Sequence, residues 1–482
     1  MKKITSDIVG KLWNLCNILK DDGVTYHQYV TELTYLLFLK MASEIEAEDQ
    51  LPNGFRWSDL IRKANYDPLE FYKILLVHLG MHGSPTIRKI FENASSFIKK
   101  SSTLSVLLLE IDKLEWYSMH REDLGDLYEG LLERNANEKK SGAGQYFTPR
   151  ALIDSMVAVT KPTLDDEIQD PAAGTGGFLI AANHYLREKN DISKLRGRRL
   201  NKYRTGTFFG MEHVQDTHRL AMMNLVLHGI EGGIEYGDTL GAEGTVLRKR
   251  GATLILTNPP FGTKKGGGRP SRDDLPYSTS NKQLSFLQHI YLSLIKNGRA
   301  AVILPDNVLF EGNLAADIRR DLMNKCNLHT ILRLPVGIFY AQGVKTSVLF
   351  FTRGINDQDN TGDVWFYDLR TNMSQFGRRT QLSRDHFAEF EKFYGNDPYG
   401  DPKSLAERSK LTETGRFKRF SRDQIAARGD NLDITWSEEN INEANFSEAD
   451  PVVLAQDIMV ELMAAVNQIE TLLEEFGEDT SQ

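Results

Sequence analysis

Cysteines and long apolar runs are both scarce in this sequence, and each scarcity excludes a class of protein. Only Cys16 and Cys326 occur among the 482 residues. Because they stand far apart, they can build neither a disulfide framework nor a zinc site of four thiolates, and both are expected to be buried fillers. No apolar run reaches the ~18 residues that a membrane helix needs, and Met1–Asp7 lacks the apolar block of a signal peptide. We therefore expect a cytoplasmic protein without a metal site.

The charge balance limits how the chain can bind nucleic acid. The formal net charge is −8 at pH 7. Lys and Arg side chains that neutralise phosphates supply most of the non-specific affinity for DNA, so this balance argues against unaided tight binding. Any DNA contact must therefore come from a local basic face or from a partner subunit. Lys264–Arg269 and Arg378-Arg379 are two basic candidates, and a solvated loop is an equal interpretation of each.

Length and periodicity predict several regions along the chain. The 482 residues exceed one typical domain of roughly 100 to 200 residues. The first part has apolar positions at three- and four-residue spacing, as in Leu33–Lys40 and Leu104–Leu114, which is typical of amphipathic helices. A linker rich in Gly and Lys, Asn135–Gly144, then precedes a different pattern. The predicted domains are a helical N-terminal domain at 1–135, an α/β domain at 136–400 and a helical C-terminal region at 401–482.

Short apolar runs alternate with helical patterns in the middle of the chain. Alternation of this kind predicts a doubly wound α/β domain with a mostly parallel sheet. The expected strands are Glu167–Asp170, Gly206–Glu212, Thr253–Thr257, Ala300–Leu304 and Thr346–Phe351, and the expected helices are Phe178–Glu188, Asp216–His228, Gln283–Lys296 and Leu314–Cys326.

A glycine-rich segment, Asp170–Phe178, stands between an expected strand and an expected helix. Glycines at such a place let the backbone approach a ligand and turn tightly into the helix. No Lys-Ser or Lys-Thr pair follows these glycines, which excludes a phosphate-binding P-loop. A plain strand-to-helix turn is the alternative interpretation of the glycines taken alone.

Glu212 ends the next expected strand and can accept hydrogen bonds from two ribose hydroxyls, as in nucleoside-binding doubly wound folds. It lies 36 residues after Gly176, and the dinucleotide-binding fingerprint has a spacing of ~20. The excess coincides with a basic insertion, Arg196–Arg204. Taken alone, a carboxylate at this position is more often simply exposed at the end of a strand.

The tetrapeptide Asn258-Pro259-Pro260-Phe261 follows another expected strand, and its chemistry suits an amino-group acceptor. The amino nitrogen of adenine is a poor nucleophile because its lone pair is delocalised into the ring. The Asn258 side-chain oxygen and the carbonyl of Pro259 can accept its two hydrogens and stabilise the charge that develops during methyl transfer. The two prolines fix that carbonyl, and Phe261 can stack on a base rotated out of the duplex. A rigid loop is the structural alternative.

These motifs together resemble a known family. Asp170–Phe178 followed by Asn258–Phe261 is similar to the first and catalytic motifs of amino-group DNA methyltransferases of the γ arrangement, which have a Rossmann-like fold. The resemblance is closer to the modification subunits of type I restriction-modification systems, and it covers nearly the whole chain. The further segments that carry it are Phe38–Lys40, Gly144–Arg150, Gly210–Glu212 continuing to Asn224, His228-Gly229, and Ile425–Trp436.

The resemblance implies a site-specific, adenine-specific DNA methyltransferase that uses S-adenosylmethionine. Under it, the α/β domain would be the methyltransferase domain, and Glu212 would hold the ribose of the cofactor. Asp238, in Tyr236-Gly237-Asp238 after a further expected strand that lies between Glu212 and Thr253, would face the cofactor adenine. The tetrapeptide that begins at Asn258 would serve the target adenine. The remaining implied cofactor-binding residues are Tyr146, Phe147, Thr148, Asp170, Ala172, Gly174, Thr175, Gly176, Gly177 and Phe178.

The resemblance also implies partners. A separate specificity subunit would read double-stranded DNA, two copies of this chain would flank it, and a restriction subunit is a possible further member of the complex. The C-terminal stretch Val452–Phe476 offers an apolar stripe that can pack against a partner helix or fold back on its own domain. The stripe consists of Val453, Ile458, Leu462, Val466, Ile469 and Leu473.

Three alternatives remain open from the sequence. A solitary adenine methyltransferase would need its own target-recognition region, and the part after residue 352 is short for one. A protein glutamine methyltransferase also uses an Asn-Pro-Pro motif, but its motif usually ends in Tyr where this chain has Phe261. The third is a non-catalytic assembly subunit, although every motif position here is chemically intact.

Overall fold

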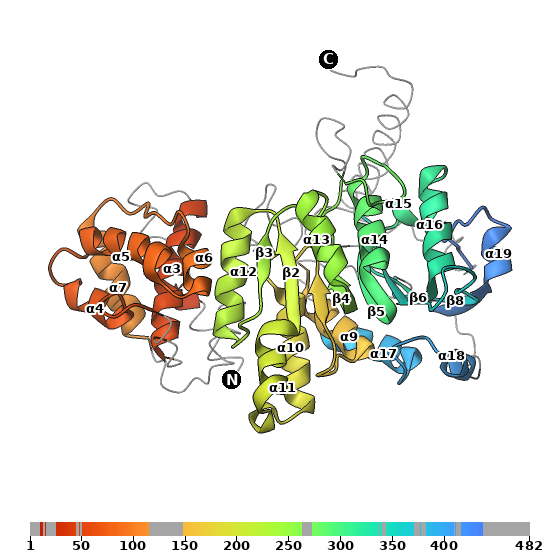
Figure 1. Cartoon of the computed structure of the whole chain (residues 1–482), viewed down its shortest axis with the longest axis horizontal. Coiled ribbons are helices and arrows are strands. Elements are labelled where there is room, and N and C mark those ends of the chain that lie inside the picture. Colours follow the sequence, from red (N-terminus) through yellow and green to blue (C-terminus); the bar gives the residue numbers. More distant parts are fainter. Residues whose placement is uncertain are drawn as a thin grey trace, which may run out of the picture. The chain divides into compact units, whose positions relative to one another are not determined.

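The structure is a computed structural model of the chain (Figure 1). Its described residues divide into two compact units. The described residues of the first unit fall within Met1–Gly144, Ala173–Gly176 and Ile192–Tyr236, and those of the second fall within Gln145–Ala172, Gly177–Asp191 and Gly237–Gln482. The residues that the structure describes are 26–44, 51–114, 148–262, 272–335, 344–370, 382–408 and 416–436, with a few short stretches besides.

Helices make up the N-terminal part of the first unit, as the apolar spacing predicts. Leu36, Phe38, Leu75 and Leu104 are fully buried in the core between them. Pro at the first helical position and a serine N-cap start one of the helices at Ser84, whose side chain accepts a hydrogen bond from the Ile87 N–H. The helices are α3 (Tyr26–Glu44), α4 (Trp57–Lys63), α5 (Pro68–His82), α6 (Pro85–Phe91) and α7 (Ser101–Asp112).

The same unit contains β2 (Phe208–Glu212), α12 (Gln215–Leu227) and β3 (Ile234–Tyr236), with the two strands paired in parallel. Helix α12 packs against α3 and α6 (Figure 1). The guanidinium of Arg219 on α12 donates to the carbonyls of Ile90 and Glu92 at the end of α6, at 2.9 Å each. A cation at a helix C-terminus is favourable because the last carbonyls there lack intrahelical partners. Arg219 therefore ties the helical part to the β2–α12–β3 segment.

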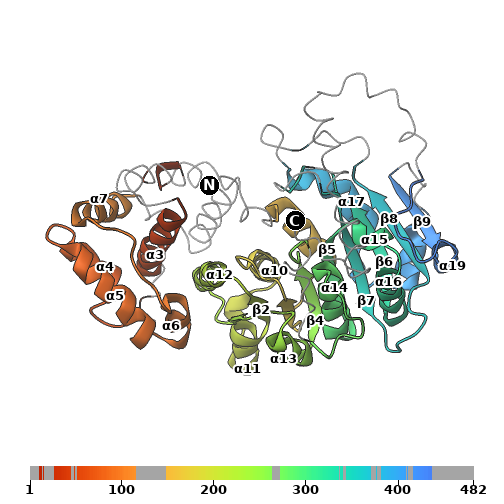
Figure 2. The ribbon, with the colours of Figure 1, turned by 90° about the horizontal axis from the view of Figure 1, so that it is seen from above.

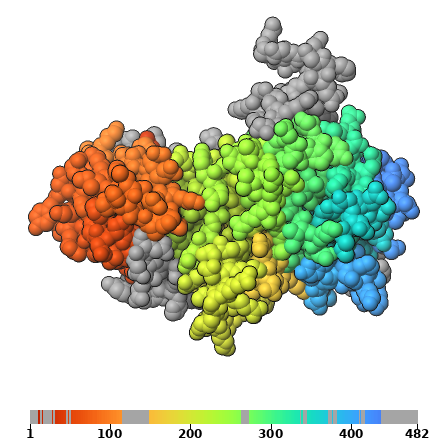
Figure 3. Space-filling view, in the orientation of Figure 1, coloured from red at the N-terminus to blue at the C-terminus, as the bar shows by residue number. Residues whose placement is uncertain are grey.

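The basic insertion folds as short helices that precede β2. The insertion falls in α11 (Gly197–Asn201) and η4 (Lys202–Gly206), and the short helix η3 (Ile192–Lys194) precedes it. Arg198 and Arg199 are exposed, and the segment lies at the surface, in yellow in Figure 3. The insertion thus lengthens the connection without displacing Glu212 from the end of β2.

The second unit is built on a mixed sheet whose neighbouring strands run in the order β1-β4-β5-β7-β6-β8-β9. The pairs β1-β4, β4-β5 and β6-β8 are parallel, whereas β7 is antiparallel to both of its neighbours and β9 is antiparallel to β8. The strands are β1 (Ile168–Asp170), β4 (Ala252–Thr257), β5 (Leu294–Pro305), β6 (Cys326–Arg333), β7 (Thr346–Arg353), β8 (Asp363–Asp368) and β9 (Phe417–Ser421).

Helices cover both faces of this sheet, as Figure 2 shows, so the predicted doubly wound α/β architecture is confirmed. One face carries α9 (Arg150–Thr160), α10 (Gly177–Lys189) and α17 (Ala388–Tyr394), and the other carries α13 (Ala242–Arg250), α14 (Lys282–Ser293) and α16 (Leu314–Lys325). The shorter helices are α15 (Asn307–Phe310), η5 (Arg384–Phe387), α18 (Pro402–Arg408) and α19 (Arg422–Ala426).

Two features of the sheet differ from the sequence expectations. Cys326 does not end a helix but begins β6, where it is fully buried, and burial raises the pKa of its thiol to about 12. The region after residue 400 is not only helical, since Phe417–Ser421 forms β9. This strand pairs with β8, and the Phe417 ring packs on Phe393 with centroids 4.6 Å apart. Tertiary pairing therefore overrides the weak local pattern there.

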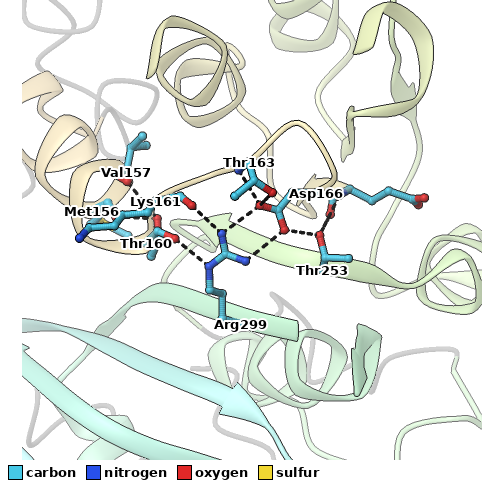
Figure 4. A network of polar contacts seen from close by, with 9 residues as sticks. Met156, Val157, Thr160, Lys161, Thr163, Asp166, Thr253 and Arg299 are labelled. Carbon is cyan, nitrogen blue, oxygen red and sulfur yellow. Dashed lines mark hydrogen bonds and ion pairs between the residues drawn. The ribbon is translucent and has the colours of Figure 1, made fainter. Parts of the chain in front are cut away.

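A buried network of hydrogen bonds and an ion pair lies at the amino ends of β1 and β4 (Figure 4). Arg299 on β5 donates from Nη1 and Nη2 to the two carboxylate oxygens of Asp166, at 3.0 Å each, and from Nε to the carbonyl of Thr160 at 2.7 Å. Asp166 also accepts from the hydroxyl of Thr253 at 2.7 Å. The network fixes the end of α9 and the entry to β1, and it leaves the carboxyl ends of the strands for ligands, as is usual in open α/β sheets. No helix in the described part of the chain is long and apolar enough to cross a membrane.

Candidate active site

The glycine segment forms the connection between β1 and α10. Asp170 ends β1 almost fully buried, and its carboxylate accepts the Ala172 N–H at 3.1 Å. Gly174 and Gly176 have φ values of +55° and +83°, a region that other residues rarely adopt. A Cβ added to Gly174 would meet nothing within 4 Å, so the space beside this backbone is open. A tight turn with an accessible backbone is what a nucleoside-binding loop requires.

Glu212 lies at the end of β2 and holds the middle of the glycine segment. Its Oε2 accepts the Gly174 N–H at 2.9 Å, and its Oε1 accepts the Val214 N–H at 2.8 Å. Burial raises the pKa of this carboxyl above its ordinary value, and the backbone donors oppose the rise. Each carboxylate oxygen can accept more than one hydrogen bond, so Glu212 keeps acceptor capacity for ribose hydroxyls.

Asn224 is a further contact to this segment. It lies on α12, it is 1% exposed, and its Nδ2 donates to the carbonyl of Thr175 at 3.1 Å. The sequence pattern includes Asn224 in the family block but gives it no role. The role of Asn224 could not be predicted from the sequence, because it depends on the tertiary contact between α12 and the glycine segment.

Asp238 follows β3 and belongs to the second unit. Its carboxylate accepts the Leu240 N–H at 2.9 Å, and its own carbonyl accepts the Gly241 N–H at 2.8 Å, which makes a tight turn. The hydroxyl of the next residue, Thr239, donates to the carbonyl of Pro171 at 2.5 Å. The turn after β3 is thus bonded to the start of the glycine segment.

Asn258 follows β4 and is 7% exposed. Its Nδ2 donates to the hydroxyl of Thr148 at 2.9 Å, across 110 positions of sequence. Its Oδ1 is buried and has no hydrogen-bond partner among the residues that the structure describes. A buried acceptor without a partner is costly unless a ligand donates to it, so this oxygen is suited to receive an N–H from outside the chain.

The residues after Asn258 hold an aromatic side chain in place. Pro259 is buried, Pro260 is half-buried, and the half-buried ring of Phe261 lies edge-on to Phe339 with centroids 6.3 Å apart. Phe339 is a neighbour that the sequence motif does not identify.

Gly262, which follows this motif, has a φ of +106° and is bonded through both of its backbone groups to Gln283. The Gln283 amide oxygen accepts the Gly262 N–H at 2.6 Å, and its nitrogen donates to the Gly262 carbonyl at 3.3 Å, in the orientation that matches donors with acceptors. Gln283 is buried on the first turn of α14, so it fixes the exit of the Asn258–Phe261 loop.

Each unit thus assembles its own part of the predicted set. The first unit brings Gly174 together with Glu212, and the second brings Thr148 together with Asn258. Gly177 and Phe178 begin α10 directly after the glycine turn. Several predicted features lie outside the described residues, namely Tyr146, Phe147, Cys16, the basic stretches Lys264–Arg269 and Arg378-Arg379, the linker Asn135–Gly144 and the C-terminal stretch Val452–Phe476.

Comparison with known proteins identifies the family to which this arrangement belongs. The family model of the N-6 DNA methylases matches residues 119–445, and that of the HsdM N-terminal domain matches residues 8–114. The chain belongs to the N-6 DNA methylase family. The resemblance seen in the motifs is therefore confirmed over more than half of the chain by the first model alone.

Relatives and solved structures narrow the family to type I methylase subunits. The chain is 46% identical to the EcoKI methylase subunit of Escherichia coli K12, over 98% of this chain and 96% of that one. It is 30% identical to the EcoEI methylase subunit of Escherichia coli, over 86% and 87%. The crystal structure of the EcoKI M protein matches with a TM-score of 0.56 at 41% identity, over 99% of this chain and 97% of that one. A type I restriction-modification system structure matches with a TM-score of 0.73 at 25% identity, over 97% of both chains.

The expected activity agrees with this assignment. The chain is an adenine-specific DNA methyltransferase of the type I methylase subunits, and the N-terminal helices correspond to the HsdM N-terminal domain.

Proposed function

We propose that the chain takes the methyl group from S-adenosylmethionine and that Asn258 receives the amino group of the target adenine. The observation that carries this proposal is the buried Asn258 Oδ1, which has no partner among the described residues. S-adenosylmethionine supplies an electrophilic methyl group on a sulfonium sulfur. The adenine N6 forms a bond to that methyl carbon while the bond from carbon to sulfur breaks, and N6 then loses a proton.

The cofactor side of the proposal rests on the glycine segment and on two acidic residues. Glu212 would accept the ribose hydroxyls with the acceptor capacity that the Gly174 and Val214 N–H groups leave. The left-handed Gly174 has open space where a Cβ would lie, which would let a nucleoside approach the backbone. Asp238 would face the cofactor adenine from the turn after β3. The remaining residues of the proposed cofactor site are Tyr146, Phe147, Thr148, Asp170, Ala172, Thr175, Gly176, Gly177 and Phe178.

The target side rests on the loop after β4. The Thr148 hydroxyl holds the Asn258 amide nitrogen, and this contact directs the amide oxygen to the position of the incoming amino group. The Pro259 carbonyl would accept the second amino hydrogen, and Phe261 would stack on the adenine after it leaves the DNA duplex. Accepting both hydrogens favours the tetrahedral nitrogen of the transition state over the planar nitrogen of the bound base.

The partners in this proposal are double-stranded DNA, a specificity subunit, a second copy of this chain and a restriction subunit. The net charge of −8 argues against tight binding of DNA by this chain alone. This supports a separate subunit that supplies the sequence-specific contacts to DNA. The similarity to type I methylase subunits over nearly the full length supports the same arrangement.

The test is the variant Asn258→Ala in the complex with the specificity subunit. Cofactor binding should stay near normal, while the methyl-transfer rate should fall by at least about two orders of magnitude, because an acceptor that acts mainly in the transition state is lost. Radiolabelled methyl transfer to a DNA duplex measures the rate, and calorimetry with S-adenosylmethionine measures binding.

A matched control is Asn327→Ala. Asn327 lies on β6 and donates to the carbonyl of Gly400 at 2.8 Å, so the control also removes a partly buried amide, but away from the proposed site. It should keep the wild-type rate. A wild-type rate in Asn258→Ala would show that the catalytic assignment is wrong.

A further inference from the structure

Arg272 is a fully buried arginine that the family motifs do not include. Its side chain is 0% exposed, and its Nε and Nη2 donate to the two carboxylate oxygens of Asp274 at 2.8 and 2.7 Å. Its Nη1 donates to the carbonyl of Thr239 at 2.8 Å and to His289 Nδ1 at 2.7 Å. Because a guanidinium can only donate, His289 accepts through Nδ1. The guanidinium therefore has partners on Asp274, Thr239 and His289 at once.

The protonation states of the neighbours keep this arrangement in place. The hydrogen bond from Arg272 lowers the pKa of Asp274 far below its ordinary value, and the Arg248 side chain adds to this effect. Burial lowers the pKa of His289 well below its ordinary value, and the nearby positive charge of Arg272 lowers it further. The network therefore consists of an ionised carboxylate, a neutral imidazole and a cation whose charge is paired.

Two further contacts connect Arg272 to the proposed cofactor site. Thr239, whose carbonyl it binds, directly follows Asp238, and the Thr239 hydroxyl donates to the carbonyl of Pro171. Gly244 makes room for the contact, since a Cβ there would lie 1.8 Å from the Thr239 carbonyl oxygen and 2.9 Å from Arg272 Nη1. The sequence and the packing thus leave space for this arginine at the turn that follows β3.

We infer that Arg272 is a positioning residue for cofactor binding. Its guanidinium fixes the Thr239 carbonyl, and Thr239 in turn fixes both the Asp238 turn and the start of the Asp170–Phe178 segment. The inference rests on the proposed function, which assigns these two backbone segments to S-adenosylmethionine. In sequence, Arg272 lies between the Asn258–Phe261 loop and α14, so a residue that follows the proposed target-base loop would also position backbone of the proposed cofactor site.

The prediction is a change in cofactor affinity with little change in the chemical step. Arg272→Lys keeps the charge but loses the planar fork of donors, so only part of the network can re-form. Thr239→Val keeps the size of the side chain and removes only the hydrogen bond to the Pro171 carbonyl. Each variant should weaken S-adenosylmethionine binding by about five- to tenfold, the scale of one lost hydrogen bond. The KM for S-adenosylmethionine should rise by a similar factor, while kcat at saturating cofactor stays close to that of the wild type.

The matched control is Arg299→Lys in the network of Figure 4. Arg299 is as buried as Arg272 and also forms a two-pronged pair with an aspartate, but it lies at the amino ends of β1 and β4. Arg299→Lys should lower the melting temperature and leave the affinity for S-adenosylmethionine unchanged. Gly244→Ala should repeat the affinity loss of Arg272→Lys, because the added Cβ displaces the same carbonyl.

Calorimetry and steady-state kinetics on the full-length chain and its complex give both readouts. The inference would be overturned if Arg272→Lys and Thr239→Val bound S-adenosylmethionine as tightly as the wild type does. If Arg272→Lys fails to fold, Gly244→Ala decides, because its added Cβ displaces the Thr239 carbonyl that Arg272 binds, and an unchanged affinity in Gly244→Ala would overturn the inference. Absence of S-adenosylmethionine binding in the wild type would instead refute the proposed function, so the two failures are distinguishable.

Discussion

Replacing Glu212 by alanine tests the cofactor side of the site most directly. The structure gives the starting point, because the carboxylate already accepts the Gly174 and Val214 N–H groups and would accept ribose hydroxyls with its remaining capacity. A hydrogen bond to a charged group contributes about 1.5 to 3 kcal/mol. The affinity for S-adenosylmethionine should therefore fall by roughly ten- to 150-fold, at 1.4 kcal/mol for each factor of ten.

The same substitution should also destabilise the free protein. It leaves the partly buried Gly174 N–H without its carboxylate, and a buried donor without a partner costs about 1 to 3 kcal/mol, whereas the N–H of the exposed Val214 can bind water instead. Isothermal titration calorimetry is therefore best done well below the melting temperature of the variant, which a thermal unfolding experiment provides.

Asp112→Ala is a suitable control for Glu212→Ala. Asp112 on α7 belongs to the same unit and also accepts two hydrogen bonds, from Trp57 Nε1 at 2.9 Å and from Lys40 Nζ at 3.0 Å. Its loss should reduce stability without changing the affinity for the cofactor. An unchanged affinity in Glu212→Ala would mean that the ribose binds elsewhere.

Two further predictions concern partners and stability. The purified chain should bind S-adenosylmethionine in calorimetry yet show little sequence-specific binding to DNA in a mobility-shift assay, because it is acidic overall, with a net charge of −8, and its sequence has no evident target-recognition region. Tight, selective binding would favour a solitary enzyme. Burial acts to raise the pKa of Asp166, but the hydrogen bonds from Arg299, Thr253 and Thr163 outweigh this effect and lower the pKa. The ionised carboxylate therefore stabilises the fold above about pH 4, and this stabilisation is lost as the pH falls through the lowered pKa. Asp166→Asn should therefore lower the free energy of unfolding in urea by about 3 to 5 kcal/mol at pH 7 and by progressively less below pH 4. An equal loss at pH 7 and below pH 4 would contradict the pairing of Asp166 with Arg299.

Much of the site can be predicted from the sequence because its signals are local. A glycine turn between a strand and a helix needs only neighbouring residues, and Asp170–Phe178 has this context in the structure. The same holds for Asn258, which directly follows a buried strand. The spacing of 36 residues between Gly176 and Glu212 departs from the usual pattern, and the structure accounts for it by three short helices before β2.

Other features could not be predicted because they depend on contacts between distant segments. β6 and β8 are buried strands whose short apolar runs do not by themselves predict strands. β9 has only a weak pattern of its own and exists through its pairing with β8. The antiparallel direction of β7 is likewise set by the path of the chain, since an isolated strand sequence carries little information about the direction of its neighbours.

The sequence by itself determined the family, the fold class and the order of the motifs, because periodicity and motif chemistry are properties of short segments. Only the tertiary structure decided which side chains meet. It brought the Thr148 hydroxyl to the Asn258 amide across 110 positions, and it placed Arg272 against the carbonyl of Thr239. Such contacts arise because buried donors and acceptors must find partners once the core excludes water, and the partner that each one finds depends on how the whole chain packs.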